Sequence, residues 1–419
     1  MYDVVVYGAT GFTGQLTAQY LAEHPQAPAV ALAGRNHAKL QKVRDALTGI
    51  SDERRASIAL VVASAEDAAS IQALARSAKV VIDTVGPYAK LGGFEVAQAV
   101  VEAGAGYVDL AGESIYCARL VQELHKRAQA THAVLVPSAG FDVLPFDLAA
   151  YFAVQEVKKA LGPDADVDHV SCGFDVRASV SGGTLATMAS MRTHPELLQY
   201  KHPYLLSPVQ GTLQPKLFRS RWLPQFAKSG AYSLFAPHNT RVVSRSWGLL
   251  EEAHLPNRYG STFRYLEAIA MPFHALAIIA SLVFPIIAWL LVHIPHIDKL
   301  FAALAPPGTG ASMATMRKGY ANLRTMAYGR DGKTQALSVF RVQGDPGYLK
   351  TAAFLAETAL TLALEKERLS PLARQGGVLT PATIGAEALA ARLGQYAGVV
   401  IRSAPVPPGT DPATVLVEA

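Results

Sequence analysis

The sequence predicts an α/β protein with a parallel-sheet domain and a second, α+β substrate domain that carries a hydrophobic helical segment. Three observations lead to this fold class. Short apolar runs alternate with helix-length segments over the first 148 residues, and this alternation then stops. Later in the chain, a run from residue 268 to residue 294 contains no Asp, Glu, Lys or Arg. We therefore divide the chain into a domain of residues 1–148 and a domain of residues 149–419.

The spacing of apolar residues predicts each helix and strand of the first domain. Apolar residues at spacings of three and four, such as Leu40, Val43 and Leu47, indicate helices, whereas short continuous apolar runs that end at Gly or Pro indicate buried strands. The expected strands are Val4–Tyr7, Ala29–Ala33, Ile58–Val62, Val80–Val85, Tyr107–Leu110 and Ala133–Pro137. The expected helices are Gly14–Glu23, Ala38–Leu47, Ala65–Ala75, Phe94–Ala103 and Cys117–Gln129. Strands that alternate with helices of this length predict a parallel sheet.

The second domain is richer in Pro, aromatic residues and irregular segments, so fewer elements can be predicted there. Val170–Val176 and Gln335–Gln343 are expected to be strands of a second sheet, and Thr351–Lys366 a long helix. The two cysteines, Cys117 and Cys172, lie in no recognisable nucleophile motif. We expect both to be small buried hydrophobic residues, with a catalytic thiol as the weaker alternative.

The charge of the chain restricts its partners. The net charge is +5 and the isoelectric point about 9.0, which suits an anionic ligand or an anionic membrane surface. The sequence has no clustered Lys/Arg stripe of the kind that nucleic-acid binding requires, so we expect no nucleic-acid partner. The densest basic stretch runs from Lys216 to Lys228 and is expected to be a solvated loop, with a membrane-surface or acyl-carrier contact as the alternative. The oligomeric state is left open.

A glycine motif after the first strand predicts a dinucleotide site. The glycines follow a strand, open a helix and are spaced GxxGxxG. Such glycines permit a tight turn, a close approach of the backbone to a pyrophosphate, and close packing of helix on strand. The helix N-terminus then offers free amides to the phosphates. The residues expected to bind the cofactor here are Gly8, Thr10, Gly11, Phe12, Thr13 and Gly14. This context predicts a Rossmann-type domain.

The end of the second strand indicates which dinucleotide binds. NAD-specific sites carry an acidic residue about 20 residues beyond the glycines, and the sequence here reads Ala-Gly-Arg-Asn, ending at Asn36. Arg35 provides a planar donor for a 2′-phosphate, so NADP(H) is the expected cofactor. At the end of the fourth strand, Thr84, Val85 and Gly86 are expected to run beside the cofactor.

The candidate catalytic residues lie at predicted strand ends or in the loops beyond them. Tyr88 is a candidate proton donor, and Glu113 or Asp142 could orient the substrate or a water molecule. The alternative is that Asp142 and a further candidate, Asp109, are turn or helix-cap residues and that Glu113 is an acid in the first turn of a helix. No cluster of Cys, His, Asp and Glu has the spacing of metal ligands, so we expect no metal. No Tyr is followed four residues later by Lys, which argues against a short-chain dehydrogenase site.

Several segments together resemble a known family. They are YGATGFTG, AGR, DTVGPY, YVDLAGE, PSAGFDVLPFDL, SGGT, GDPGYLKTAAFLAETAL and GGVLTPATIG, and they extend from Tyr7 to Gly385. With them the chain resembles the saccharopine dehydrogenase-like oxidoreductases, and within these the trans-acting enoyl reductase branch. The resemblance implies an N-terminal NADP-binding domain and a C-terminal substrate domain. It also implies reduction of an enoyl group on a polyketide or lipid chain held by a partner synthase.

Two alternatives to an enoyl (or carbonyl) reductase of a lipid-like acyl substrate stay open. One is an amino-acid dehydrogenase of the saccharopine type, although the long apolar run suits a lipid better than a zwitterion. The other is a membrane-associated protein that binds NADP without turnover and acts as a scaffold. The first strand begins at Asp3, so we expect no signal peptide and a cytoplasmic location, with peripheral attachment to the inner face of the membrane as a further option.

The apolar run Ala268–Ile294 accounts for the positive mean hydropathy of +0.20. Its length suffices to span a bilayer. A single crossing would, however, separate segments of the resemblance that should pack in one compartment. Pro272 and Pro285 would each break or kink a continuous helix. We therefore expect a helix–turn–helix hairpin that dips into one leaflet or lines an acyl tunnel, with a buried helical pair as the alternative.

Overall fold

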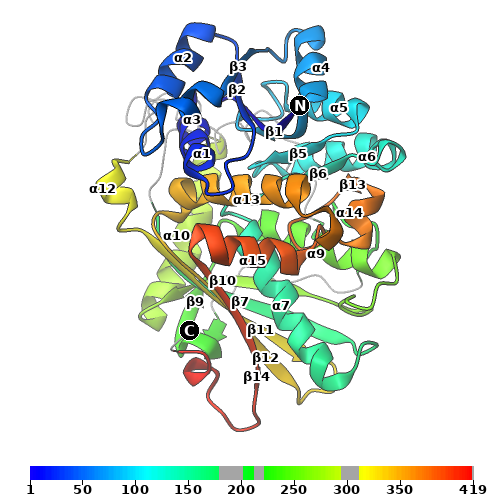
Figure 1. Ribbon diagram of the computed structural model, residues 1–419. Helices are drawn as coiled ribbons and strands as arrows, with labels where there is room; N and C mark the ends of the chain where they lie inside the picture. The colour runs from blue at the N-terminus through cyan, green and yellow to red at the C-terminus, as the bar shows by residue number, and fades with distance from the viewer. Residues whose placement is uncertain (179–201, 212–220, 294–310, 418–419) are drawn as a thin grey trace.

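The computed structural model describes residues 1–178, 202–211, 221–293 and 311–417, and within them two seven-stranded sheets form the frame (Figure 1). Sheet A has the order β13-β6-β5-β4-β1-β2-β3, and every neighbouring pair in it is parallel. Its strands are β1 (Tyr2–Tyr7), β2 (Val30–Gly34), β3 (Ala59–Val62), β4 (Ala78–Asp83), β5 (Gly106–Asp109), β6 (Val134–Val136) and β13 (Gly377–Val378). The order reverses between β1 and β4, as in doubly wound dinucleotide-binding sheets.

The helices of the first domain connect the strands of sheet A. They are α1 (Phe12–Glu23), α2 (His37–Asp45), α3 (Asp52–Ser57), α4 (Ala68–Ser77), α5 (Gly93–Ala103) and α6 (Ser114–Thr131). The six predicted strands and five predicted helices are confirmed, with small shifts at their ends. Helix α4 begins later than predicted because the Asp67 side chain accepts hydrogen bonds from the first free amides, at Ala69 and Ser70. The short helix α3, which contains no buried residue, was not predicted.

Sheet B has the order β14-β12-β11-β7-β10-β9-β8 and is mixed, since β7 and β10 run parallel and the other pairs antiparallel. Its strands are β7 (Val167–Arg177), β8 (Arg221–Leu223), β9 (Lys228–Ala231), β10 (Tyr265–Met271), β11 (Tyr320–Gly329), β12 (Gln335–Gln343) and β14 (Val399–Val406). The predicted strands in β7 and β12 are confirmed. The predicted loop between Lys216 and Lys228 is wrong from residue 221 onward, where β8 and β9 form a hairpin. Residues 212–220 and the segment SGGT lie outside the described residues.

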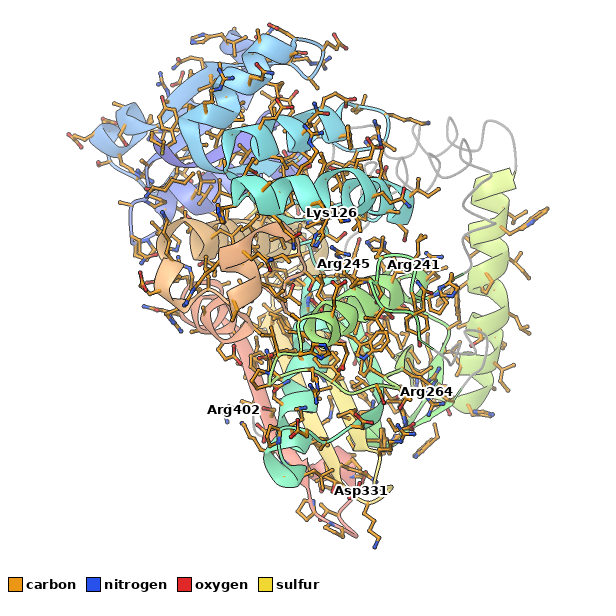
Figure 2. All side chains as sticks on the ribbon, turned by 90° about the vertical axis from the view of Figure 1, so that its right-hand side faces the viewer. Lys126, Arg241, Arg245, Arg264, Asp331 and Arg402 are labelled. Carbon is orange, nitrogen blue, oxygen red and sulfur yellow. The ribbon has the colours of Figure 1, made fainter. Side chains whose placement is uncertain are left out.

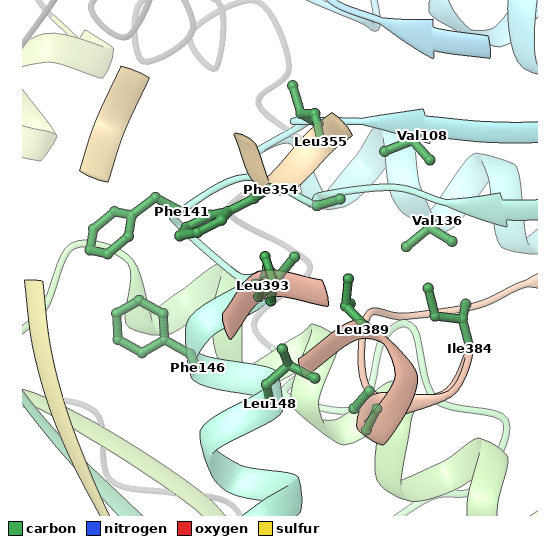
Figure 3. Close-up of a cluster of buried hydrophobic side chains, with 14 of the residues drawn as sticks. Val108, Val136, Phe141, Phe146, Leu148, Phe354, Leu355, Ile384, Leu389 and Leu393 are labelled. Carbon is green, nitrogen blue, oxygen red and sulfur yellow. The ribbon is translucent and has the colours of Figure 1, made fainter. Parts of the chain in front are cut away.

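Helices between the sheets create one continuous core. Helices α7 (Leu144–Leu161), α9 (Ala236–Glu252), α13 (Thr351–Leu364) and α15 (Ala386–Ala397) lie there. Helix α13 packs on β1, β4 and β5 of sheet A, while α7 packs on β11, β12 and β14 of sheet B. Figure 3 shows the junction, where Val108 and Val136 of sheet A, Phe146 of α7, Phe354 of α13 and Leu389 of α15 belong to one buried cluster. The chain thus returns to sheet A after residue 149, since β13 also pairs with β6.

The apolar run folds differently from the predicted hairpin. Its first residues complete β10, and a single helix, α10 (His274–His293), then continues through Pro285. The hairpin is therefore wrong, and so is the buried helical pair, because Leu282 of α10 is 63% exposed and Ile279 55%. In the part of the chain that the structure describes, no helix has the length and hydropathy needed to cross a membrane. Both cysteines are free and buried, as predicted.

Candidate cofactor and substrate site

The candidate site lies at the carboxyl edge of sheet A, around the point between β1 and β4 where the strand order reverses. Loops that follow β1, β2, β4, β5 and β6 meet at this edge because the strands are parallel. Ligands of open α/β sheets bind in the crevice at such a point. The fold therefore brings together the glycine loop, Arg35, the segment Thr84–Gly86 and Asp142 at one edge of the sheet.

The glycine loop is shaped by two glycines that cannot carry a side chain. Gly8 has a φ of +82°, and a Cβ there would lie 2.6 Å from the Val85 side chain at the end of β4. A Cβ on Gly14 would lie 2.9 Å from the Cα of Ala9, inside the loop backbone. Gly11 is different, because a Cβ there would meet only the Gly8 carbonyl oxygen, at 3.3 Å, and the residue is exposed. Gly8 and Gly14 thus close the loop, and Gly11 faces the ligand space.

Helix α1 presents its N-terminus to that space. Gly11 is the N-cap, no side chain caps the helix, and the first turn contains no acidic residue. Free amides and the positive end of the helix dipole therefore suit a pyrophosphate. Thr10 and Thr13 border the same turn, where the Thr10 carbonyl accepts a hydrogen bond from Gln15 and the Thr13 carbonyl accepts one from Thr17. The Phe12 ring packs edge-on against the ring of Tyr348, from the second half of the chain, with 5.4 Å between the ring centroids.

A cavity of about 440 Å³ lies beyond the ends of β1, β2, β3 and β4, and it continues along the loop after β4 to the start of α6. Arg35 is exposed at its β2 side, and Ser64 and Ala65 border it after β3. The neighbouring Asn36 caps helix α2 by accepting from the Lys39 amide, which leaves Arg35 as the polar side chain that reaches the cavity from β2. The position and the guanidinium fit the adenosine half of a dinucleotide that carries a 2′-phosphate.

The loop after β4 is held from behind by two of the predicted catalytic residues. The carboxylate of Glu113 accepts hydrogen bonds from the amides of Tyr88, at 2.9 Å, and Ala89, at 3.0 Å. The Tyr88 hydroxyl is buried, donates to the Asp83 carbonyl at 2.9 Å and accepts from the Leu110 amide at 3.3 Å. Both side chains already have partners, so this geometry favours a supporting role for them and leaves their catalytic role a prediction.

The supported loop carries Thr84, Val85 and Gly86. The Thr84 hydroxyl and amide both donate to the Tyr7 carbonyl at the end of β1, at 2.9 and 3.0 Å. The Val85 amide donates to the Asp83 carboxylate at 2.8 Å, and Gly86 is exposed. These bonds fasten the loop beside the glycine loop, where the sequence predicts that it borders the cofactor.

Two fully buried carboxyl groups lie beneath this loop. The Tyr107 hydroxyl donates to Asp83 at 3.2 Å and bonds the Tyr116 hydroxyl at 2.8 Å. Burial, together with the nearby charge of Asp109, raises the pKa of Asp83 to about 8. Burial likewise raises the pKa of Asp109 to about 6. Asp109 accepts from the amides of Ala111 and Ser138, each at 2.8 Å, so it is a turn residue, as the sequence suggested.

Asp142, the third predicted catalytic residue, lies in the turn between β6 and α7. Its side chain is exposed to solvent, yet the surrounding protein raises its pKa to about 6 by desolvation. It does not cap α7, whose N-cap is Val143. Its charge also contributes to raising the pKa of Glu267 in β10, to about 7, although burial of Glu267 is the larger cause. Glu267 was not predicted as a site residue. The feature of the sequence that could have pointed to it is a single acidic residue inside an otherwise apolar strand.

A buried hydrogen-bond chain joins this edge to α9, and its direction can be assigned. Ser138 donates to the Ala111 carbonyl at 2.6 Å, so its oxygen accepts from Nε2–H of His238 at 3.0 Å. The other ring nitrogen, Nδ1, then accepts from the Ser114 hydroxyl at 2.8 Å, and Ser114 accepts from Arg241 at 3.1 Å. Burial and the charge of Arg241 lower the pKa of His238 to about 3, which keeps the ring neutral.

The sequence did not single out this chain of bonds, because its members lie far apart along the polypeptide. Figure 2 shows Arg241 on the helix below α6, next to Arg245 of the same helix. Arg245 is buried and donates to the Val378 carbonyl of β13 at 3.1 Å. Helix α9 therefore joins the second half of the chain to both the β5–β6 side and the outer strand of sheet A.

The doubly wound sheet, the glycine loop at the reversal point and the Arg35 cavity define an NADP-dependent oxidoreductase with a Rossmann-type cofactor domain. The family model for the saccharopine dehydrogenase NADP binding domain matches residues 4–136. The chain is 36% identical over 424 residues to a trans-acting enoyl reductase of Mycobacterium tuberculosis, which covers 96% of this chain and 97% of that relative. It belongs to the trans-acting enoyl reductase family.

Other comparisons agree with this assignment. A trans-acting enoyl reductase of Mycobacterium ulcerans is 35% identical over 425 residues, again covering 96% of this chain and 97% of the relative. Among solved structures, apo saccharopine dehydrogenase (L-Glu forming) from Saccharomyces cerevisiae superposes with a TM-score of 0.54 at 14% identity, covering 97% of this chain and 100% of that chain. This likeness confirms the predicted fold class. The predicted cofactor, NADP(H), is likewise confirmed.

Proposed function

We propose that this enzyme uses NADPH to reduce an enoyl (or carbonyl) group of a lipid-like or polyketide acyl substrate that a carrier or partner synthase presents. The names of its relatives support the reaction type. The observation that carries the proposal is the position of Asp142, an exposed residue with a raised pKa on the same sheet edge as the glycine loop. A group that can donate a proton therefore lies on the edge of the sheet at which the cofactor is proposed to bind.

In this proposal each part of the site has a separate role. Gly8, Gly11 and the N-terminus of α1 bind the pyrophosphate, and Arg35 binds the 2′-phosphate. The bound NADPH supplies the hydride. The loop at Thr84–Gly86, held in place by Glu113, borders the nicotinamide end. Asp142, whose pKa of about 6 leaves part of it protonated near neutral pH, donates the proton to the α-carbon.

We further propose that the cofactor occupies the domain of residues 1–148 and the substrate the domain of residues 149–419. The edge-on contact between Phe12 and Tyr348 supports a site at the junction of the two. We also propose that the reaction belongs to lipid metabolism and takes place at the cytoplasmic face of a membrane, to which the enzyme attaches peripherally. The large apolar side chains exposed on α10 support this placement.

NADPH consumption, followed by its fluorescence, tests the proposed reaction. The purified enzyme is given an enoyl thioester on an acyl carrier protein, a 3-oxoacyl thioester, or a 2-oxo acid with an amino acid. We expect turnover with the enoyl thioester. Turnover only with the 2-oxo acid and amino acid would favour saccharopine-type chemistry, and no turnover with any of the three would favour the scaffold alternative.

The role of Asp142 has its own test. Asp142→Asn should lower kcat without changing NADPH affinity. The wild-type kcat should fall as the pH rises above about 6, because Asp142 loses its proton. The kcat of the variant should not show this decrease. Asp52→Asn, at a side chain that is 97% exposed, is the matched control. A variant with wild-type kcat and pH profile would remove Asp142 from the reaction.

A further inference from the structure

We propose that the outward face of α10, together with Trp222, inserts into one leaflet of a membrane that contains anionic lipid and anchors the enzyme in the plane of its surface. The purpose of this anchor rests on the proposed function, since a lipid-like acyl substrate is found at a membrane. Binding to lipid itself requires no turnover.

Helix α10 turns its large apolar side chains toward the solvent, whereas a helix on the surface of a water-soluble protein turns them toward the core. The side of α10 that faces the protein carries small residues. Ala277 and Ala280 are buried against Ala231 of β9, and Ser281 accepts a hydrogen bond from the Tyr232 amide at 3.0 Å. Its outward side is large and apolar. The exposed residues are Leu276 (40%), Ile278 (43%), Ile279 (55%), Leu282 (63%), Val283 (40%), Ile286 (56%) and Ile287 (42%). A surface helix normally turns its apolar stripe toward the core.

The shape of this apolar surface fits hydrocarbon better than a protein groove. At 100° per residue, the exposed side chains cover an arc of roughly 180° along about 17 Å of helix. No Asp, Glu, Lys or Arg interrupts the run from Ala268 to Ile294. Protein–protein interfaces have a polar rim around their apolar centre, and this convex half-cylinder has none on the helix itself. Amphipathic helices that lie in a membrane interface bury such a face among the acyl chains.

Aromatic residues extend the surface at the beginning of the helix. Trp222 is 62% exposed and pairs across the β8–β9 hairpin with Ser229. Cross-strand partners project from the same face, and Ser229 bonds His274 at the first turn of α10 at 3.1 Å. Trp222 therefore lies beside the start of the helix, where Phe273 is 69% exposed. Tryptophan is enriched where a protein surface meets the headgroup layer.

Exposed cations lie at the same end of sheet B. Strands β7 and β10 are parallel, so β7 ends at Arg177 near the point where the chain enters α10. Arg177 pairs in register with Tyr320, which Arg317 and Lys318 closely precede. All three cations are exposed, and among the described residues none forms an ion pair with a carboxylate. Their charge is complementary to anionic headgroups.

The orientation follows from the packing of α10. Because its inner side rests on β9 over Ala277 and Ala280, the helix lies along the body of the protein. Figure 2 shows it as the pale green helix that runs along the right-hand edge of the molecule. Only the outer half-cylinder can then enter lipid, to a depth of one side-chain layer.

Vesicle flotation tests the anchor. The whole enzyme is mixed with vesicles of phosphatidylcholine alone or of phosphatidylcholine with phosphatidylglycerol, in low and high salt. The test variant carries Ile279→Gln, Leu282→Gln and Ile286→Gln. The matched control carries Val62→Gln, Leu364→Gln and Val417→Gln, three exposed apolar residues elsewhere. NADPH binding, measured without lipid, checks that each variant is folded.

We expect the wild type and the control to float with the anionic vesicles and the test variant to lose roughly a hundredfold in partitioning, because three aliphatic side chains no longer transfer into lipid. High salt should weaken the binding of the wild type. A wild type that binds neither vesicle, or a control that loses binding equally, would overturn the proposal. Dimerisation of the wild type without lipid, abolished in the test variant, would instead assign this face to a second copy of the chain.

The two proposals fail separately. An enzyme that floats with anionic vesicles but does not oxidise NADPH with any acyl thioester would retain the anchor and lose the proposed reaction. An enzyme that reduces soluble enoyl thioesters and ignores vesicles would retain the reaction and lose the anchor.

Discussion

The two halves of the carboxyl edge of sheet A are built in different ways. On the β1–β4 side the surface is mostly backbone: two glycines without room for a Cβ, free amides at the start of α1, and a loop fastened to the Tyr7 carbonyl. On the β5–β6 side the surface consists of side chains that meet from distant segments, such as Ser114, Ser138 and His238. The first half is suited to hold a ligand, whereas the second holds the two halves of the protein together.

The difference shows which parts of a site tolerate substitution. A backbone surface fails when a side chain occupies the ligand space, and the fold can survive that. A buried hydrogen-bond chain fails when one member is removed, because its partners lose their hydrogen bonds without gaining water. Substitutions in the backbone surface on the β1–β4 side should therefore affect cofactor binding, and those in the buried hydrogen-bond chain on the β5–β6 side should affect stability.

The largest expected effect is on cofactor binding by Gly11→Val. The new side chain would occupy the space that the pyrophosphate needs, while inside the protein a Cβ at this position meets only the Gly8 carbonyl oxygen. We expect NADPH binding to become undetectable by calorimetry, with little change in the melting temperature. Unchanged affinity would show that the glycine motif is only a turn.

Gly14→Val is the control that sharpens this contrast. A Cβ at Gly14 lies 2.9 Å from the Ala9 Cα, so the helix cannot stay against the loop. This variant should lose stability as well as binding. Two variants with the same thermal profile would contradict the division between a glycine that faces the ligand and one that packs the helix.

On the other half of the edge, His238→Phe should destabilise the protein by about 2–4 kcal/mol, because two buried serine hydroxyls lose a partner. NADPH affinity should stay near that of the wild type. Urea unfolding of His238→Phe, Ser138→Ala and the double variant measures the coupling between them. Fully additive losses would show that His238 and Ser138 do not act through one hydrogen bond.

The pH dependence of this loss has a fixed sign. The folded-state pKa of His238, about 3, lies below its unfolded value of about 6.5, so below pH 6.5 the unfolded chain binds more protons. The stability that the neutral ring contributes is therefore present above pH 6.5 and is lost as the pH falls toward 3. The difference in stability between wild type and His238→Phe should shrink over this range. A constant difference would mean that the ring is not held neutral.

The sequence predicts the β1–β4 side well because its signals are local. The motif from Gly8 to Gly14 contains its own strand end, turn and helix start, and Arg35 ends the next strand. The β5–β6 side depends on contacts such as Ser138 with His238, which lie 100 residues apart. No spacing in the sequence indicates such a pair, and for that reason His238 was not among the predicted site residues.

The apolar run was misread for a different reason. Pro285 predicted a break, but a Pro in a helix removes one backbone hydrogen bond and need not end the helix. Residues 268–271 belong to β10, where sheet pairing with Ala231 and Gly230 determines their conformation. Apolar composition alone could not divide the run into a buried strand and an exposed helix.

A smaller effect is expected for Arg35→Asp, again on the ligand side of the comparison. Loss of a charge-assisted pair with the 2′-phosphate should cost about 1.5–3 kcal/mol of NADPH affinity, and NADH affinity should change much less. Fluorescence titration with both cofactors measures the ratio. Since Arg35 is exposed, the fold should not change. Equal losses for the two cofactors would separate Arg35 from the 2′-phosphate.

The smallest effect tests a residue on the boundary between the two halves. Glu113 follows β5, but its carboxylate accepts the amides of Tyr88 and Ala89 from the β4 loop. Glu113→Gln keeps one accepting oxygen and turns an NH2 group toward the second amide, which should cost about 1 kcal/mol of stability. Glu123→Gln, at a half-exposed ion pair, should cost close to nothing. If Glu113 only supports the loop, the variant should have a lower melting temperature, bind NADPH slightly less tightly and keep the pH profile of turnover. A changed pH profile would instead indicate that Glu113 takes part in catalysis.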